Sequence, residues 1–292
     1  MLTFPNAKIN IGLNIIEKRP DGFHNIESVF YPVGWCDALE IVPAESFRFQ
    51  SSGLTIPGDE QGNLCIKAYQ LLIDTGKLNH ERQSSGGHPF SSYTSAFHTS
   101  QAIMFHLHKV IPMGAGLGGG SADGAFALKM LNEFYQLNLT TNALQNLARQ
   151  LGSDCAFFIE NRPVYCFNKG DEFEDYGLDL KGKFIILVNP AIHISTAEAY
   201  AGVNPCKPAI SLKEALQLPI NQWKGIVKND FEEKLLIKYP TIASTKESLY
   251  EKGALYASMT GSGSTVYGIF DKEIDLKDTF FSFAVWQGWL GS

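Results

Sequence analysis

Apolar and polar residues alternate strictly near the start of the chain, and this alternation predicts a β-strand with two different faces. From Ala7 to Ile15 every second residue is apolar, and the residues between them are polar or glycine. Because successive side chains of a strand point to opposite faces, Lys8 and Asn10 share the polar face. The Asp21-Gly22 pair then predicts a tight hairpin turn that leads into a second strand.

The remainder of the first half predicts mixed strands and helices. Short strands are expected within residues 35–56 and at 102–110, and helices at 63–74, 122–135 and 141–151, the last ending at Gly152. Of the 18 residues from 83 to 100, 11 are Ser, Thr, Gly or Pro. Such a segment has little apolar surface to bury, so we expect a mobile surface loop there.

The second half begins again with strands, at 164–168 and 184–188. Helices are expected around 196–201, 211–217 and 230–251, and two strands joined by a glycine turn across 256–270. No internal repeat is present. The sequence therefore predicts an α+β protein with two lobes that meet near residue 160, residues 1–160 forming one domain and 161–292 the other.

Composition narrows the class of protein. The 292 residues are 45% hydrophobic, and 30 acidic residues outnumber 24 basic ones, for a net charge of −6. With no basic block, the chain is not expected to bind nucleic acid or a membrane surface. No apolar run is long enough to span a bilayer, and we expect no targeting segment, because the N-terminus lacks a charged region followed by an apolar stretch. Five cysteines without a Cys-x-x-Cys pair suit reduced thiols, so we expect a cytoplasmic location.

Five glycines between residues 114 and 120, placed between a predicted strand and a predicted helix, form the clearest chemical signal. Glycines let a backbone approach a ligand closely, and the N-terminus of the following helix favours negative charge. A simple turn needs only one or two glycines, so an anion site is favoured over a purely structural turn. A small anionic substrate therefore fits the chain despite its acidic composition.

Two common anion-binding motifs fit this loop poorly. A P-loop requires Lys and then Ser or Thr after the last glycine, whereas Gly120 is followed by Ser121 and Ala122. Gly114, Gly116 and Gly119 match the dinucleotide fingerprint, but a second helix follows where that fingerprint needs a strand ending in an acid. An NAD-binding oxidoreductase therefore stays open as a weaker alternative, which nicotinamide binding would test.

Residues 112–125, Pro-Met-Gly-Ala-Gly-Leu-Gly-Gly-Gly-Ser-Ala-Asp-Gly-Ala, resemble the phosphate loop of the GHMP kinases. Residues 5–13 resemble the first motif of that family and residues 259–265 the third. The resemblance implies a two-lobe α+β fold, with an N-terminal lobe like domain 2 of ribosomal protein S5 and a ferredoxin-like C-terminal lobe. It also implies an ATP-dependent kinase that uses Mg²⁺ and phosphorylates the hydroxyl of a small molecule, as a monomer or weak homodimer.

Two further segments, residues 19–24 (Arg-Pro-Asp-Gly-Phe-His) and 152–154 (Gly-Ser-Asp), are similar to one branch of the family. In that branch the accepting alcohol carries a cytidine diphosphate. A sister kinase acting on mevalonate, homoserine or a sugar is the main alternative, although those substrates offer no base to recognise. A non-catalytic binding protein that keeps only the fold is another, and the retention of Lys8 and Asp154 counts against it.

Asp154 is the expected proton acceptor. It lies between Gly152 and the apolar segment 155–159, an unusual place for a lone carboxylate, where a cap of a helix or turn is the structural alternative. The resemblance implies that Asp154 takes the proton of the substrate hydroxyl. It also implies that Lys8 keeps Asp154 ionised and stabilises the transferring phosphoryl group, whereas the pattern alone allows Lys8 on a solvated strand face.

The resemblance implies a nucleotide site built around the glycine loop. Ser121 could offer its hydroxyl to the magnesium ion or to the phosphates, or could only cap the helix, and Asp123 could only shape the turn. Lys109 fits an ordinary surface lysine equally well. The expected nucleotide-binding residues are Pro112, Met113, Gly114, Ala115, Gly116, Leu117, Gly118, Gly119, Gly120, Ser121, Asn63, Leu64 and Lys109.

The resemblance also implies a site for the base of the alcohol substrate. Phe23 and Tyr200 are expected to sandwich the cytosine, because bases stack favourably on aromatic rings. His24 is expected to hydrogen-bond the edge of the cytosine. A hairpin tip folded onto its own lobe is the alternative for Phe23 and His24. The expected substrate-binding residues are Asn10, Phe23, His24, Thr196, Tyr200, Gly261 and Ser262.

Histidines cluster around the polar loop but do not have the spacing of a zinc site. His80, His88, His98, His106 and His108 include no His-Glu-x-x-His pair. We expect solvated side chains rather than metal ligands at these positions.

Overall fold

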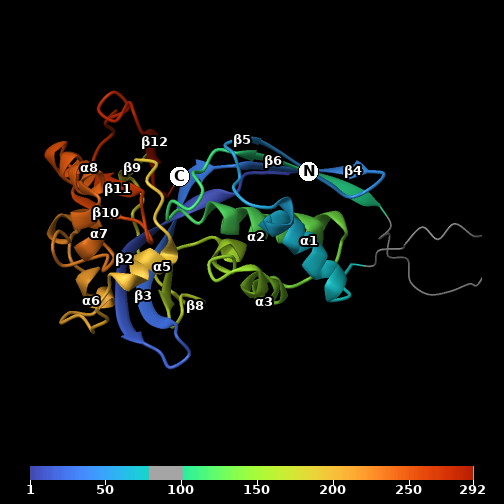
Figure 1. Cartoon of the computed structure of the whole chain (residues 1–292), viewed down its shortest axis with the longest axis horizontal. Helices are drawn as coiled ribbons and strands as arrows, with labels where there is room; N and C mark the ends of the chain where they lie inside the picture. The colour runs from blue at the N-terminus through green and yellow to red at the C-terminus, as the bar shows by residue number, and fades with distance from the viewer. Residues whose placement is uncertain (79–100, 292) are drawn as a thin grey trace, which may run out of the picture.

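The computed structural model describes residues 1–78 and 101–291, and Figure 1 shows the arrangement of their helices and strands. The loop predicted at 83–100, with His80, His88 and His98, lies outside the described residues. The described part contains three four-stranded sheets, with strand orders β1-β4-β6-β5, β2-β3-β7-β8 and β10-β11-β9-β12. It is a mixed α+β structure, as the sequence predicts.

The first sheet lies over a layer of helices, on the right of Figure 1. Buried apolar side chains of β4 and β6 form one core with those of α1, α2 and α3. Thr140 caps the amphipathic α3, and Asn63 caps α1, through side-chain oxygens that accept backbone N–H groups. The bounds are β1 (Leu2–Thr3), β4 (Ala38–Ala44), β5 (Arg48–Gly53), β6 (Ala102–Lys109), α1 (Leu64–Asp74), α2 (Gly119–Phe134), α3 (Thr141–Leu151) and α4 (Phe157–Glu160).

The second sheet contains the long hairpin of β2 (Asn6–Lys18) and β3 (His24–Cys36), which projects downward in Figure 1. The hairpin turn predicted at Asp21-Gly22 is confirmed, since Lys18 pairs with His24 across it. β7 (Val164–Phe167) and β8 (Glu172–Asp175) complete this sheet. Residues on both sides of position 160 therefore belong to one sheet.

The third sheet is antiparallel throughout and carries α7 and α8, on the left of Figure 1. Across the sheet the strands lie in the order β10, β11, β9 and β12. The helices are inserted in the chain between β9 and β10. This is the arrangement of a ferredoxin-like sheet. The bounds are β9 (Phe184–Asn189), β10 (Tyr256–Met259), β11 (Val266–Phe270), β12 (Ala284–Trp289), α5 (Thr196–Ala201), α6 (Leu212–Ala215), α7 (Glu232–Lys238) and α8 (Pro240–Glu251). Two 3-10 turns span Glu60–Gly62 and Ile220–Gln222.

A segment of the C-terminal half packs directly on β2. The backbone of Leu13 accepts a hydrogen bond from Asp230 N–H and donates one to Lys228 C=O, at 2.8 and 2.7 Å, and the Asp230 carboxylate accepts the N–H of Ile15 at 2.7 Å. The strand that carries Lys8 is therefore held between the two halves of the chain. Both of its faces are buried as far as Ile15, so the solvated strand face considered as the alternative for Lys8 is not present.

Most predicted elements are present, and the differences have local causes. The helix expected over 230–251 is divided, because Pro240 can only begin a helix and so separates α7 from α8. The sequence pattern missed three strands, the two-residue β1, β8 and β12, whose residues are only partly buried or exposed. In the described part of the chain no helix has the length and apolar character needed to cross a membrane.

Candidate active site

The glycine loop connects β6 to α2, as the sequence predicts. Gly114, Gly116 and Gly118 have φ angles of 63°, 79° and 70°, a region that residues with a side chain rarely adopt. The remaining glycines, Gly119 and Gly120, form the first turn of α2. The backbone N–H groups at that helix end have no partner within the helix, so the loop and the helix together could hold an anion.

The third motif lies directly behind the loop. A Cβ atom on Gly116 would lie 2.0 Å from the backbone oxygen of Thr260, and one on Gly261 would lie 3.1 Å from the Cα of Gly116. The hydroxyl of Thr260 also donates to the Gly116 carbonyl at 3.1 Å. The two backbones can approach this closely because glycine stands at both positions.

Lys8 and Asp154 come together from β2 and the turn after α3. Their Nζ and Oδ2 atoms are 3.4 Å apart, with Lys8 buried and the Asp154 side chain 28% exposed. The Lys8 ammonium also donates to Asn10 Oδ1 at 2.5 Å and to the Gly116 carbonyl at 3.3 Å, and it lies over the Phe30 ring. These contacts hold a cation beside a carboxylate that solvent can still reach.

Asn10 links Lys8 to the rest of the buried polar network. Its side-chain amide donates to Ser28 Oγ at 2.9 Å, and its backbone N–H donates to Thr260 Oγ1 at 3.0 Å. The Tyr267 hydroxyl donates to the Asn10 carbonyl at 2.9 Å. Because each group has a partner, the position of the Lys8 ammonium is fixed from several directions.

Two cavities meet at Asp154. One, of about 430 Å³, lies over the glycine loop: every residue from 112 to 121 except Leu117 lines it, with Leu64 and residues 193–196. The other, of about 330 Å³, contains Lys8, Asn10, Lys169 and Tyr200. Residues lining both are Gly116, Gly118, Ser121, Asp154, Thr196 and Ser262. The carboxylate therefore stands where a group bound in one cavity would face a group bound in the other.

The aromatic ring that lies against Tyr200 of the second cavity is not the expected one. His24, not Phe23, stacks on Tyr200, with ring centroids 4.6 Å apart and an interplanar angle of 20°. Phe23 is 60% exposed, with Lys169 over its ring at 5.4 Å. A sandwich of Phe23 and Tyr200 is therefore not formed in this structure, because the His24 ring lies against Tyr200.

Burial shifts the pKa of both stacked groups. Burial, with a smaller effect from the charge of Lys18, lowers the pKa of His24, which favours the neutral imidazole. Burial raises the pKa of Tyr200, so its hydroxyl stays protonated. The ring pair thus presents neutral hydrogen-bonding groups beside the charged centre formed by Lys8 and Asp154.

Lys109 lies beneath the loop rather than in its cavity. It is fully buried and forms ion pairs with Asp37 and, at 2.6 Å, with Asp123 of α2. Burial opposes the charge on Lys109, but the two carboxylates outweigh it and raise the Lys109 pKa. A Cβ atom on Gly119 would lie 3.1 Å from the Lys109 ammonium. The surface position considered for Lys109 is wrong, and its side chain supports the loop from below.

The two carboxylates of this triad differ in their surroundings. Asp37 accepts the backbone N–H groups of Val110 and Ile111 at 2.6 and 2.8 Å. Asp123 Oδ1 is buried without a hydrogen-bond partner among the described residues. Burial raises the pKa of Asp123 to about 7, although Lys109 opposes the shift, and Asp37 adds to it. The triad fixes the end of β6 to the start of α2.

Other expected site residues occupy supporting positions. Leu117 is buried, and its carbonyl accepts the Lys8 N–H at 2.9 Å, while Asn63 caps α1 beside Leu64. Sequence reasoning missed Lys169 and His193, which line the second and the first cavity respectively. Each is a single polar residue in a connecting segment, and no local pattern distinguishes it from solvated residues.

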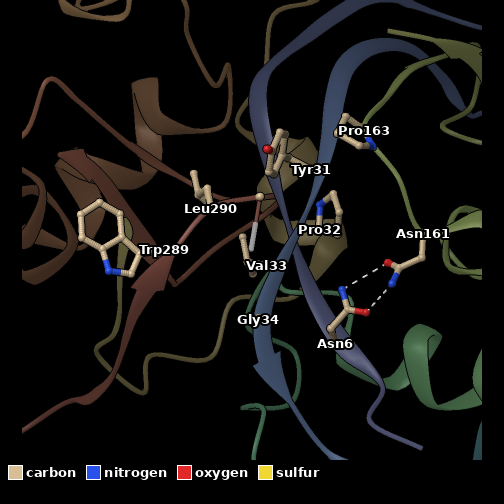
Figure 2. Close-up of a pocket in the computed structure, with 10 residues that line it drawn as sticks. Asn6, Tyr31, Pro32, Val33, Gly34, Asn161, Pro163, Trp289 and Leu290 are labelled. Atoms are coloured by element: carbon tan, nitrogen blue, oxygen red, sulfur yellow. Dashed lines mark hydrogen bonds between the residues drawn. The ribbon is translucent and has the colours of Figure 1, made fainter. Parts of the chain in front are cut away.

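A third cavity, of about 320 Å³, lies beside the opposite end of the long hairpin (Figure 2). The side chains of Asn6 and Asn161 exchange two hydrogen bonds along its wall, at 2.6 and 3.2 Å. The remaining lining residues include Tyr31, Pro163 and Trp289, and no carboxylate or ammonium group is among them. This cavity therefore lacks the charged groups suited to phosphoryl transfer, which the two cavities at Asp154 contain.

The fold and the charged site define the class of protein. Residues 81–161 match the model of the GHMP kinase N-terminal domain, and residues 211–278 match the GHMP kinase C-terminal model. The chain belongs to the GHMP kinase family. A solved mevalonate kinase structure shares the fold, with a TM-score of 0.68 over 98% of both chains at 15% identity.

Particular members of the family are much more similar to this chain. It is 47% identical to the 4-diphosphocytidyl-2-C-methyl-D-erythritol kinase of Cytophaga hutchinsonii, over 93% of each chain. It is also 47% identical to the enzyme of that name from Bacteroides thetaiotaomicron, over 96% of this chain and 95% of the relative. A crystal structure of a 4-(cytidine 5'-diphospho)-2C-methyl-D-erythritol kinase matches with a TM-score of 0.78, at 25% identity and over the whole of both chains.

Proposed function

We propose that this protein transfers the γ-phosphoryl group of ATP to the 2-hydroxyl of 4-diphosphocytidyl-2-C-methyl-D-erythritol, a step of non-mevalonate isoprenoid biosynthesis. The observation that carries the proposal is the position of Asp154. It lines both the cavity over the glycine loop and the cavity that contains Tyr200, with the Lys8 ammonium 3.4 Å away. A donor and an acceptor bound in these cavities would meet at that carboxylate.

Asp154 then acts as the general base. As the substrate oxygen attacks the γ-phosphorus, the hydroxyl proton passes to the Asp154 carboxylate. A new P–O bond forms, the bond to the β-phosphate breaks, and ADP leaves. The Lys8 ammonium, 3.4 Å from Asp154, stabilises negative charge on the phosphoryl oxygens. Its contacts with Asn10 and Gly116 hold the ammonium in place for this role.

A magnesium ion fits the residues at the junction of the cavities. Magnesium prefers oxygen ligands and usually keeps several waters, so one or two protein oxygens and the substrate phosphates are enough. Ser121 offers its hydroxyl there. When bound, the ion would neutralise charge on the phosphates. In the described part of the chain no group of three or more His, Cys, Asp or Glu residues forms a self-sufficient metal cage.

The base of the acceptor would bind at the tip of the hairpin. His24 and Phe23 come from the β2–β3 turn and Tyr200 from α5, and the neutral His24 ring can hydrogen-bond a pyrimidine edge. Since the centroids of His24 and Tyr200 are only 4.6 Å apart, a base that stacks on Tyr200 must displace the His24 ring. Thr196, Asn10, Gly261 and Ser262 would line the path from the base to the reacting hydroxyl.

The alternatives fit less well. Relatives between 43% and 47% identical carry the name of the cytidylyl-alcohol kinase, whereas the matched mevalonate and homoserine kinase structures share 14–17% of residues. The NAD-binding alternative requires a strand after α2, and α3 stands there instead. A cytoplasmic location and a monomer or weak homodimer stay predictions of the sequence.

A coupled assay of ADP release with magnesium and ATP tests the proposal. Four alcohols are compared: the cytidylyl substrate, mevalonate, homoserine and galactose. We expect turnover with the cytidylyl substrate alone. Turnover with another alcohol would be consistent with the roles of Lys8 and Asp154 but would contradict the proposed binding site for cytosine. Absence of turnover with all four would contradict the kinase assignment and favour a binding protein.

A further inference from the structure

His193 stands at the wall of the cavity over the glycine loop, in the segment between β9 and α5. Its side chain is exposed, and the imidazole Nδ1 is 3.6 Å from the place that a Cβ of Gly114 would occupy. The ring therefore covers the first glycine of the loop from the side of the C-terminal lobe. Because Gly114 has no side chain, the imidazole can lie close to the loop backbone.

Positive charge is scarce in this cavity. Of the described residues that line it, Asp154 and His193 are the ionisable ones, and only His193 can become a cation. Lys109 lies beneath the loop, but it is buried and neutralised by Asp37 and Asp123. Lys8 lines the neighbouring cavity and is paired with Asp154. The triphosphate of a nucleotide is strongly anionic, and a charged hydrogen-bond donor is an effective partner for it.

We propose that His193 binds the polyphosphate chain of the nucleotide, as an imidazolium that closes the glycine loop from the C-terminal lobe. It would add a charge-assisted hydrogen bond to those that the backbone N–H groups of the loop and of α2 can donate. Because histidine changes its charge in the physiological pH range, nucleotide affinity then depends on pH. The inference rests on ATP being the donor in the proposed function, but not on the identity of the accepting alcohol.

Two carboxylates stand near His193. Asp154 faces it across the cavity, and Glu198 lies on α5. Glu198 is already engaged: hydrogen bonds from Lys238 and Tyr239, with a smaller contribution from the charge of His193, lower its pKa. The Glu198 carboxylate therefore interacts mainly with Lys238 and Tyr239.

Calorimetric titration with a non-hydrolysable ATP analogue and magnesium tests the proposal, at about pH 6 and about pH 8. The proteins are the unmodified chain, His193→Gln, His193→Lys and, as a control, His108→Gln, which changes an exposed histidine of β6 that lines neither cavity. Adenosine is a second probe, since it lacks phosphates. At each pH the free ligand has the same protonation state for every variant, so a difference in affinity between variants reports on residue 193.

We expect His193→Gln to weaken binding of the analogue about tenfold at pH 6 and by less at pH 8, with adenosine binding unchanged. His193→Lys should restore affinity at both pH values, and His108→Gln should behave as the unmodified chain. Equal affinity of His193→Gln and the unmodified chain at both pH values would overturn the inference, as would an equal loss with adenosine. Failure of the unmodified chain to bind the analogue would instead contradict the proposed kinase function itself.

Discussion

The ring of His24, at the tip of the β2–β3 hairpin, stacks on the ring of Tyr200 in α5, with centroids 4.6 Å apart. Tyr200 packs in turn edge-on against Phe231, at 5.0 Å. The hairpin tip is thus anchored to the C-terminal half by aromatic contacts. In the proposed function this is also the base site, so the cytosine of the acceptor must replace the His24 ring on the face of Tyr200.

Replacing Tyr200 by alanine tests this pair. Burial against its neighbours lowers the pKa of His24, so removing the Tyr200 ring should raise that pKa toward its ordinary value. Because the pKa of His24 is lower in the folded state than in the unfolded state, burial of the neutral ring contributes fully to folding stability above the unfolded-state pKa. That stabilisation is lost as pH falls through the folded-state pKa. An NMR titration of the His24 ring measures the shift directly.

The same variant should raise the KM for the acceptor more than it lowers kcat, because the base is remote from the reacting hydroxyl. Phe283→Ala, in the C-terminal half and away from both cavities, controls for the loss of an aromatic ring. A fall in kcat with an unchanged KM would place Tyr200 outside the base site. An unchanged His24 titration would contradict the role of the stack in burying the imidazole.

Asp154→Asn should lower turnover by about 10²–10⁴-fold while leaving nucleotide binding largely intact. The amide keeps the shape of the side chain but cannot accept the proton, and it also removes the charge partner of Lys8. Steady-state kinetics and a nucleotide titration on the same preparation separate the two effects. Asp175→Asn, at an exposed ion pair with Arg162, is the control. A near-normal rate in Asp154→Asn would remove Asp154 from the mechanism.

Lys169 has no assigned role in the sequence motifs, yet it lines the acceptor cavity and lies over Phe23. The proposed acceptor carries a diphosphate, and an ammonium group beside the base site suits it. Lys169→Met should therefore raise the acceptor KM about tenfold and leave the ATP KM unchanged. Lys207→Met, distant from both cavities, serves for comparison. Equal effects on both KM values would argue for a general structural disturbance instead.

The sequence predicted the parts of the site that are local. The glycine loop and the Lys8 motif can be recognised from residues that are neighbours in the chain. The remaining features of the site depend on contacts between residues that are far apart in the chain. The polar face of β2 is buried because residues 228–230 and Thr260, more than 200 positions away, bond to it. No local pattern indicates such partners, and this is also why the placement of His193 and Lys109 escaped prediction.

Lys109→Met should destabilise the fold by about 3–5 kcal/mol, because it leaves the carboxylates of Asp37 and Asp123 buried without their cation. Chemical denaturation measures the free energy of unfolding. Lys67→Met, on the exposed side of α1, should cost less than about 1 kcal/mol. A Lys109→Met variant as stable as the unmodified chain would mean that the triad contributes little to the position of the loop.

Gly116→Ala should disrupt the contact between the loop and the third motif. The φ angle of 79° alone costs a residue with a side chain about 1–3 kcal/mol. The added Cβ would also lie 2.0 Å from the Thr260 oxygen, a distance that forces the two backbones apart. Gly120→Ala is the matched comparison within the same loop: its φ is not positive, and its nearest neighbour is the flexible end of Met113, at 3.5 Å.

Denaturation curves of the two alanine variants should therefore separate clearly. We expect Gly116→Ala to lower the free energy of unfolding by several kcal/mol and to lose nucleotide binding. Gly120→Ala should change the free energy of unfolding by less than about 1 kcal/mol, because alanine favours the first turn of α2. Equal stability of both variants would show that the loop can move away from Thr260 at little cost. The close approach of the two motifs would then not be what fixes the Gly116 carbonyl beside the Lys8 ammonium.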